Sequence, residues 1–144
     1  MTIEELRAAV ESGEIDTVLV CFVDMQGRLI GKRVTGWFFL EHGQDELHAC
    51  DYLLTVDMAM EPVPGYASAS WDKGYGDFVM RPDMATLRRA PWLEGTALML
   101  ADVLDHHGAL LPHAPRSILR RQLAKARDMG FVSKIGTELD LYVF

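Results

Sequence analysis

The first third of the chain shows one helical pattern followed by two strand patterns. Thr2 and Glu5 have the spacing of a capping box, and apolar residues then recur at helical intervals until Gly13. The β-branched run "IDTVLVCFV" predicts a buried strand, and "RLIGKRV" predicts a second strand that returns after the turn "DMQG". This region is therefore predicted to be a helix and a β-hairpin, with "GWFFLEHG" as a short turn or helix.

The middle of the chain carries three more strand patterns and one long aperiodic segment. Apolar stretches predict strands in "HACDYLLTVDM", "DFVMRPD" and "TALMLADVLD". Between the first two, "EPVPGYASASWDKGYG" is rich in proline, glycine, serine and aromatic residues and has no period. We expect a long loop here, and long ordered loops in compact domains are often functional.

The last thirty residues predict a helix and then a strand. "PRSILRRQLAKARDMG" has a proline in its first turn, an apolar stripe and a closing glycine, as a helix does. In "GTELDLYVF", Glu138 and Asp140 share one face of the expected strand, whereas Leu139 and Leu141 share the apolar face. Because such a face needs covering, we expect this strand to be the first of a further domain. The elements together predict an α+β fold.

Composition and charge exclude some classes of partner. The 144 residues carry a net charge of −7, which argues against nucleic acid and anionic membranes as partners. No apolar run approaches the roughly 18 residues that a membrane span needs. The N-terminal stretch is acidic and helical, unlike a signal peptide, so we expect a cytoplasmic protein. Cys21 and Cys50 stand in apolar runs without metal or redox spacing, and we expect both to be buried free thiols.

Four segments resemble, in the same order, motifs of the glutamine synthetase family. "VDMQGRLIGKRV" resembles that family's first hairpin, and "DFVMRPDMATLRRAPW" resembles its D-x-x-T stretch. "PRSILRRQLAKARDMG" resembles the helix before the catalytic domain, and "GTELDLYVF" resembles the G-x-E-x-E-F segment that opens that domain. The resemblance implies a β-grasp domain over residues 1–112. It also implies that residues 113–144 are a linker helix and the truncated start of an ATP- and metal-binding catalytic domain.

The same resemblance assigns a role to the two acids near the end of the chain. It implies that Glu138 and Asp140 each bind one of two divalent cations, Mg²⁺ or Mn²⁺, for which carboxylates are suitable ligands. Asp140 is one methylene shorter than the glutamate of the family motif, so its metal would sit closer or be held through water. Taken alone, the pattern favours two ordinary acids on a solvent-facing strand edge, because E-x-D is common.

The long loop departs from the family pattern. In ammonia-using members a D-G-S-S segment precedes the matching tryptophan, and its aspartate binds ammonium; here the segment reads "PGYASASW". The first carboxylate after this segment is Asp72. We expect the loop to bind a larger amine through a tyrosine ring, two hydroxyls and a tryptophan, namely Tyr66, Ser68, Ser70 and Trp71. In the alternative, the loop has a different shape and Asp72 or Asp77 supplies the missing acid.

Three functions follow from these observations. The first is the N-terminal portion of an ATP-dependent ligase of nitrogen metabolism that joins the γ-carboxylate of glutamate to a small amine through a γ-glutamyl phosphate. The second is an authentic glutamine synthetase that uses ammonia, and the third is a non-catalytic β-grasp interaction module. The family implies a homo-oligomeric ring, a dodecamer, for the full-length enzyme. We expect the 144-residue chain alone to be inactive, and a monomer or weak dimer.

Overall fold

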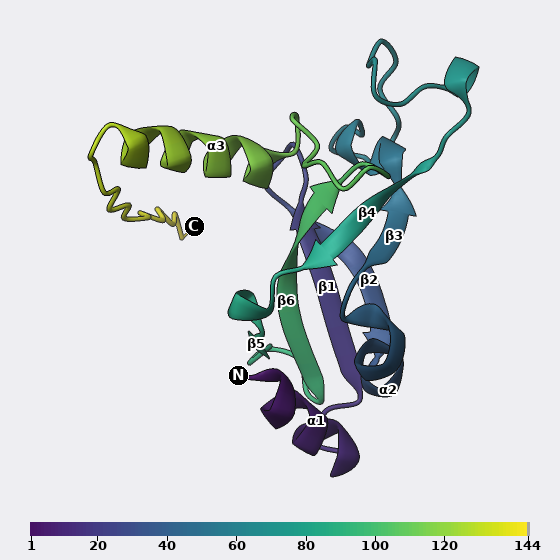
Figure 1. Cartoon of the computed structure of the whole chain (residues 1–144), viewed down its shortest axis with the longest axis vertical. Coiled ribbons are helices and arrows are strands. Elements are labelled where there is room, and N and C mark those ends of the chain that lie inside the picture. The colour runs from purple at the N-terminus through teal and green to yellow at the C-terminus, as the bar shows by residue number, and fades with distance from the viewer. Residues whose placement is uncertain (144) are drawn as a thin grey trace.

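A computed structural model describes residues 1–143, which form a six-stranded mixed sheet with helices around it (Figure 1). The strands run in the order β2-β1-β6-β4-β3, and β5 pairs with β6 outside this path. Their bounds are β1 Thr17–Val23, β2 Leu29–Thr35, β3 Leu47–Cys50, β4 Asp77–Pro82, β5 Arg88–Arg89 and β6 Thr96–Leu104. The central strands β1 and β6 are parallel, whereas the other pairs are antiparallel. The predicted α+β fold and its first hairpin are confirmed.

Helix α1, Ile3–Glu11, begins at the predicted capping box. The Thr2 hydroxyl accepts from the Glu5 amide at 3.2 Å, and the Glu5 carboxylate accepts from the Thr2 amide at 2.8 Å. These two bonds satisfy amides that the first turn of a helix leaves unpaired. The chain leaves the helix through Gly13, whose φ of +76° is readily adopted only by glycine.

The remaining helices are short, apart from α3. Helix α2, Gly36–Phe38, continues into one π-helical turn, Phe39–Gly43, which confirms the short helix expected at "GWFFLEHG". Single 3₁₀ turns occupy Asp51–Leu54, Trp71–Lys73 and Met84–Thr86, and α3 spans Pro115–Asp128. Among residues 1–143, no helix is both long enough and apolar enough to cross a membrane.

The main core lies on one face of the sheet. Alternate residues of β1 point to it, including Val20 and Phe22, and residues of β3, β4 and β6 extend it. Phe22 meets Phe78 of β4 edge-on, with the ring centroids 5.1 Å apart. Apolar side chains of α1 and of the segment 36–43 cover this face. The opposite face carries a smaller cluster of Cys21, Ala90 and Leu98.

Two expectations about the third strand are wrong. Within "HACDYLLTVDM" the strand ends at Cys50, and the chain then turns through the 3₁₀ helix Asp51–Leu54. Cys50 is exposed, whereas Cys21 is buried as expected. The reason is that β3 is an edge strand, so residues on its outer face meet solvent. The two-residue strand β5 was not predicted, because two residues are too few to show a period.

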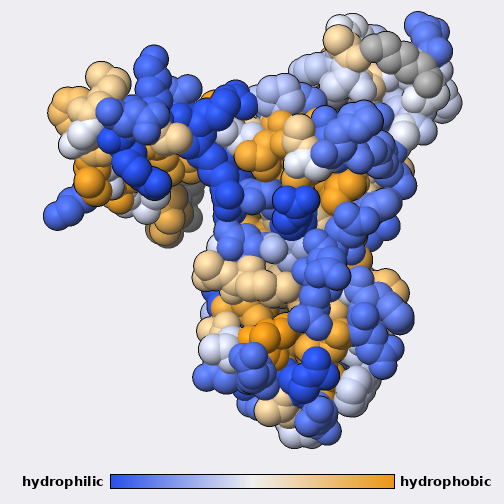
Figure 2. All heavy atoms as spheres, in the orientation of Figure 1, coloured by the Kyte–Doolittle hydropathy of each residue, from blue (hydrophilic) through white to orange (hydrophobic). Residues whose placement is uncertain are grey.

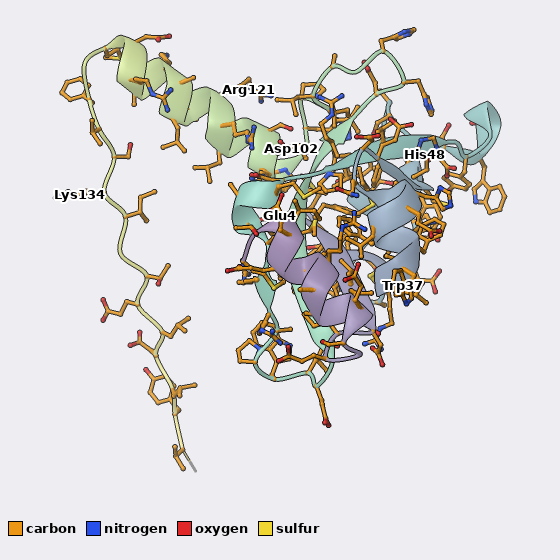
Figure 3. The ribbon with its side chains drawn as sticks, turned by 60° about the horizontal axis from the view of Figure 1, so that its bottom comes forward. Glu4, Trp37, His48, Asp102, Arg121 and Lys134 are labelled. Carbon is orange, nitrogen blue, oxygen red and sulfur yellow. The ribbon has the colours of Figure 1, made fainter. Side chains whose placement is uncertain are left out.

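The strand expected at 136–144 is also wrong for its described part. Residues 131–143 have no regular secondary structure and are exposed, and Phe144 lies outside the described residues. A strand must pair its backbone with another strand, and none of the described strands pairs with this segment. Figure 3 shows the segment, with Lys134 labelled, lying apart from the sheet.

Helix α3 confirms the prediction for 115–128, but its apolar stripe is largely uncovered. Only its first turn enters the core, through Ala114 and Ser117. Ile118 and Leu119 are 40% and 50% exposed, and Phe131 beyond the helix is 64% exposed. Figure 2 shows hydrophobic residues at the surface of the arm formed by α3, beside hydrophilic ones.

Candidate functional site

The long loop between β3 and β4 is closed at its base by hydrogen bonds. The Asp51 amide donates to the Gly76 carbonyl at 2.9 Å, and the Gly76 amide donates to the Asp51 carboxylate at 3.2 Å. Within the loop, Val56 and Pro62 form an isolated antiparallel β-bridge. The two ends of the loop therefore meet, and Asp51 and Asp77, which flank it, lie at the same end of the β3–β4 pair.

Aromatic rings line one side of the loop. Trp71 packs edge-on against Tyr75 at 5.0 Å, and Tyr75 packs against Tyr52 at 5.4 Å. Trp71 is nevertheless 82% exposed. A hollow of about 210 Å³ lies beside these rings, and Ser70 and Trp71 line it together. We call it the aromatic hollow; its lining is Pro62, Val63, Pro64, Gly65, Ala69, Ser70, Trp71, Asp72 and Tyr75.

Of the four residues predicted to bind an amine, two line the same hollow. Ser70 and Trp71 line the aromatic hollow, and Tyr66, 42% exposed, lines neither this hollow nor the next. Ser68 lines a second hollow of about 160 Å³, which we call the acidic hollow. Its other lining residues are Asp51, Asp77, Phe78, Asp105, His106, Leu111 and His113.

Three carboxylates gather at the acidic hollow. Asp51 precedes the loop, Asp77 follows it, and Asp105 comes from the turn after β6. One oxygen of Asp51, Oδ1, is buried and has no hydrogen-bond partner among the described residues. An unpaired buried carboxylate oxygen is costly, so it favours a cationic donor. Of the two acids that the sequence offered as alternatives, Asp77 lines this hollow and Asp72 lines the aromatic hollow. Asp51 was not predicted, because the closure of the loop brings it to this place.

Two titratable groups around the hollow have shifted pKa values. Asp105 Oδ1 accepts hydrogen bonds from the backbone amides of Ala109 and His107, both at 2.9 Å. The bond from Ala109 is the main cause of a lowered Asp105 pKa, which keeps this carboxyl ionised. Burial lowers the pKa of His113, so that this ring is neutral at pH 7. The hollow therefore suits a primary ammonium group.

The predicted metal ligands lie apart from both hollows. Glu138 and Asp140 are exposed on the irregular segment after α3. Within residues 1–143, no three His, Cys, Asp or Glu side chains are grouped so that they could hold a metal ion. Carboxylate oxygens are the donors that Mg²⁺ and Mn²⁺ prefer, so the two acids fit such a cation in chemistry. Because Mg²⁺ takes six ligands, the remaining donors must come from other groups.

The chain is similar in sequence to two ligases of known activity. It is 53% identical over 146 residues to the γ-glutamylethanolamide synthetase GlnA4 of Streptomyces coelicolor, covering 99% of this chain and 31% of that protein. It is 33% identical to a glutamate–isopropylamine ligase of a Pseudomonas species, over 96% of this chain and 30% of that protein. The chain is a relative of the glutamine synthetase-like ligases. It spans about a third of the length of these two relatives.

A solved structure supports the fold. A novel glutamine synthase homologue superposes with a TM-score of 0.66 at 16% identity, over 80% of this chain and 27% of its own. At this identity the likeness concerns the fold alone. No family model matches the chain.

Proposed function

We propose that this chain is part of an ATP-dependent ligase that joins the γ-carboxylate of glutamate to a small amine. The observation that carries the proposal is its 53% identity, over 99% of the chain, to a γ-glutamylethanolamide synthetase. Within it, residues 1–112 are a β-grasp domain, and residues 113–144 lead into the catalytic domain. The mixed sheet with its parallel central pair supports the first assignment.

The amine is proposed to bind where the loop meets the sheet. Its ammonium group would donate to the unpaired oxygen of Asp51 and to the Ser68 hydroxyl, because charge-assisted hydrogen bonds to a shielded carboxylate are strong. Phe78 lines the same hollow and can cover the carbons of the amine, at about 0.8 kcal/mol for each buried CH₂. Tyr66, Ser70 and Trp71 lie further out on the loop and would contact the rest of a longer amine.

The nucleotide and metal belong to the proposed whole enzyme. ATP is its second substrate, and Glu138 and Asp140 each supply a carboxylate to a divalent cation, Mg²⁺ or Mn²⁺. When bound, such a cation offsets the charge on the phosphate that is transferred. The exposure of both acids supports this role, because their oxygens are open to additional ligands from phosphate and water.

A second candidate, an ammonia-using glutamine synthetase, is favoured by the acidic hollow itself. Asp51 supplies the anionic partner that ammonium needs and that the loop segment "PGYASASW" lacks. The two candidate substrates, ammonium and a larger amine, differ in the apolar contacts that they can make in the hollow. Carbon atoms of a larger amine bury apolar surface against Phe78 and Leu111, whereas ammonium gains nothing there.

We expect the full-length protein to prefer a carbon-bearing amine to ammonium by at least about tenfold in kcat/KM, because burying two CH₂ groups is worth about 1.6 kcal/mol. Asp51→Asn should raise the KM for the amine about tenfold and leave the KM for glutamate unchanged. The measurement is phosphate release from ATP with glutamate and ethanolamine, isopropylamine, putrescine or ammonium. Asp45→Asn, at an exposed aspartate outside both hollows, is the matched control.

Each result of that assay decides between the candidates. A preference of the wild-type protein for ammonium transfers the assignment to an authentic glutamine synthetase. If no phosphate is released with any amine, both enzymatic candidates are refuted, and the non-catalytic interaction module is the remaining candidate. Equal effects of Asp51→Asn and Asp45→Asn would remove Asp51 from the amine site.

The 144-residue chain alone is expected to release no phosphate from ATP in the same assay, because its two candidate metal ligands have no third protein ligand near them in the described chain. We also propose that it is a monomer or weak dimer, whereas the full-length enzyme is a homo-oligomeric ring. Light scattering of both forms measures this. A stable ring of the short chain, or its turnover of ATP with glutamate and an amine, contradicts the expectation.

A further inference from the structure

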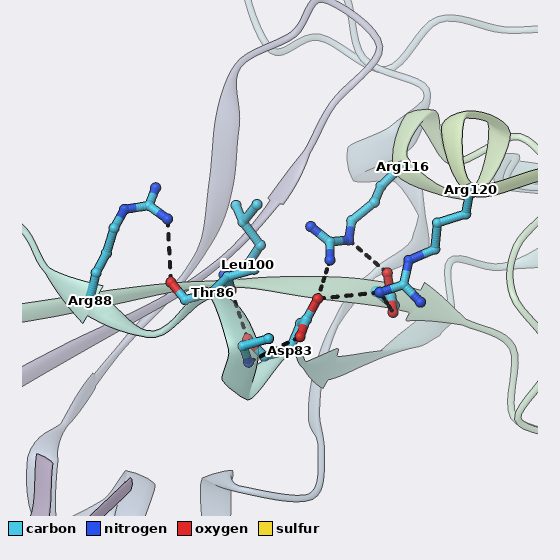
Figure 4. Close-up of polar contacts among 8 residues, drawn as sticks. Asp83, Thr86, Arg88, Leu100, Arg116 and Arg120 are labelled. Carbon is cyan, nitrogen blue, oxygen red and sulfur yellow. Dashed lines mark hydrogen bonds and ion pairs between the residues drawn. The ribbon is translucent and has the colours of Figure 1, made fainter. Parts of the chain in front are cut away.

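Four charged side chains join the start of α3 to the sheet (Figure 4). Arg116 donates from Nε to Asp102 at 2.8 Å and from Nη2 to Asp83. Arg120 Nη2 contacts the same two carboxylates, at 3.2 Å from Asp83 and 3.0 Å from Asp102. Each arginine thus bridges both aspartates, and each aspartate receives both arginines. We call these four residues the arginine clamp.

The clamp is better shielded than an ordinary surface ion pair. The side chains of Asp102, Asp83 and Arg116 are 13%, 21% and 20% exposed, and only Arg120, at 45%, is largely in solvent. Asp102 lies within β6, and Asp83 follows β4 and holds the Ala85 amide at 3.2 Å. Both carboxylates are therefore fixed by the sheet. Two anchors, one within β6 and one just after the neighbouring strand β4, fix the direction of the helix, which a single anchor does not.

Beyond the clamp, little of the described chain holds α3. Ala114 and Ser117 are buried, but Ile118 and Leu119 are exposed, and of the residues from 120 to 143 only Leu123 and Ala126 are half-buried. Arg121 adds one hydrogen bond, to the carbonyl of Pro112 at 2.7 Å, just before the helix. A helix of 14 residues is about 21 Å long, so a tilt of about 10° at its first turn moves its far end by roughly 4 Å. The contacts in the first two turns therefore decide where the rest of the chain is carried.

We propose that Arg116 and Arg120 are positioning residues that set the direction of α3 relative to the sheet, and so the place to which the chain carries Glu138 and Asp140. The part concerning these two acids rests on the proposed function. The direction of α3 does not, because it can be measured on the chain without any activity. A planar guanidinium is suited to this task, since it donates from two nitrogens held in a fixed geometry.

The test is a distance measurement by double electron–electron resonance on this 144-residue chain. One spin label is placed on the native Cys50, which is exposed on the edge strand β3, and the other on Asp128→Cys at the end of α3. Buried Cys21 is replaced with alanine to avoid a third label. We expect one narrow distance distribution in this parent, and a distribution broadened by several ångströms in Arg116→Met/Arg120→Met.

Two further variants separate direction from general stability. Arg127→Met removes an exposed charge from the same helix outside the clamp, and it should leave the distribution narrow. Arg116→Lys/Arg120→Lys keeps the charges but not the bridging geometry, and it should broaden the distribution partly. Circular dichroism checks that helix and sheet content are retained. If the double methionine variant does not fold, Arg120→Met alone, at the more exposed arginine, replaces it.

The outcomes overturn different parts of the proposal. An unchanged distribution in a folded clamp variant refutes the positioning role. In the full-length enzyme, the clamp variants should raise the Mn²⁺ concentration for half-maximal activity at least threefold and leave the KM for the amine unchanged. A broadened distribution with unchanged Mn²⁺ dependence refutes the link to Glu138 and Asp140. A wild-type protein without ligase activity refutes the proposed function and leaves the distance result standing.

Discussion

Phe78→Ala is expected to lower the free energy of unfolding by about 3–5 kcal/mol, the usual cost of deleting a buried aromatic ring. Phe78 is 2% exposed in β4 and meets the Phe22 ring edge-on at 5.1 Å. Its removal leaves a void between strands that are fixed by pairing on both sides, so the core cannot close around it. Urea denaturation of wild-type and variant chains, followed by circular dichroism, measures the difference.

The control is Phe38→Ala on α2, where the ring is 43% exposed. Much of this ring already meets water, so we expect its loss to cost less than about 1 kcal/mol. Equal costs for the two substitutions would contradict the assignment of Phe78 to the centre of the core. Because Phe78 also lines the acidic hollow, Phe78→Ala in the full-length protein should weaken amine binding as well.

Asp24→Asn is expected to cost about 2–3 kcal/mol at pH 7, the range for hydrogen bonds to charged groups. Asp24 is 1% exposed in the turn of the first hairpin. Its Oδ1 accepts from the Gln26 and Arg28 amides at 2.9 and 2.8 Å, and its Oδ2 accepts from Arg28 Nε at 2.6 Å. The side-chain oxygen of an asparagine can still accept the hydrogen bonds from the two backbone amides. Its NH₂ group would then face Arg28 Nε, and two donors cannot hydrogen-bond to each other.

The same substitution should change how stability depends on pH. Burial opposes ionisation of Asp24, but its hydrogen bonds from Arg28 and Gln26 and the Arg28 charge outweigh burial, and the net pKa lies below its ordinary value of 3.8. The unfolded chain therefore binds the proton first. The stabilisation is complete above the unfolded pKa and is lost as the pH falls towards the folded one.

Urea titrations between pH 6 and pH 2.5 give the test. The wild-type chain should lose stability as the pH falls below about 4, and Asp24→Asn should lack this contribution. Asp45→Asn, at an exposed aspartate, should keep the wild-type profile. A profile of Asp24→Asn that parallels the wild type would show that Asp24 does not carry the effect.

The elements that the sequence predicted correctly are those whose signals lie in residues close together in the chain. The capping box at Thr2 and the apolar runs of β1 and β6 are set by neighbouring residues, and each formed where expected. The end of β3 and the two-residue β5 depend on which strands lie at the edges, which no local pattern contains. The segment 136–143 has the alternation of a strand, but pairing requires a partner that the described chain does not offer.

The candidate site was predicted only in part, for the same physical reason. The loop was recognised by its composition, and Ser70 and Trp71 do line one hollow together. Asp77, one of the two alternative acids, lines the hollow with Ser68. Asp51 joins them through the closure of the loop at Gly76, which no pattern predicted. The arginine clamp was equally hidden, because its aspartates become neighbours only through the pairing of β4 with β6.

The parallel pairing of β1 with β6 decides the order in which the chain can fold. Thr17 lies opposite Thr96, so the centre of the sheet joins segments from the two ends of the domain. Contacts so distant in sequence slow folding, because a long loop must close before they stabilise anything. During synthesis the hairpin of β1 and β2 emerges early, with one apolar strand edge open until β6 arrives. During that interval this strand edge is open to pairing with a wrong strand.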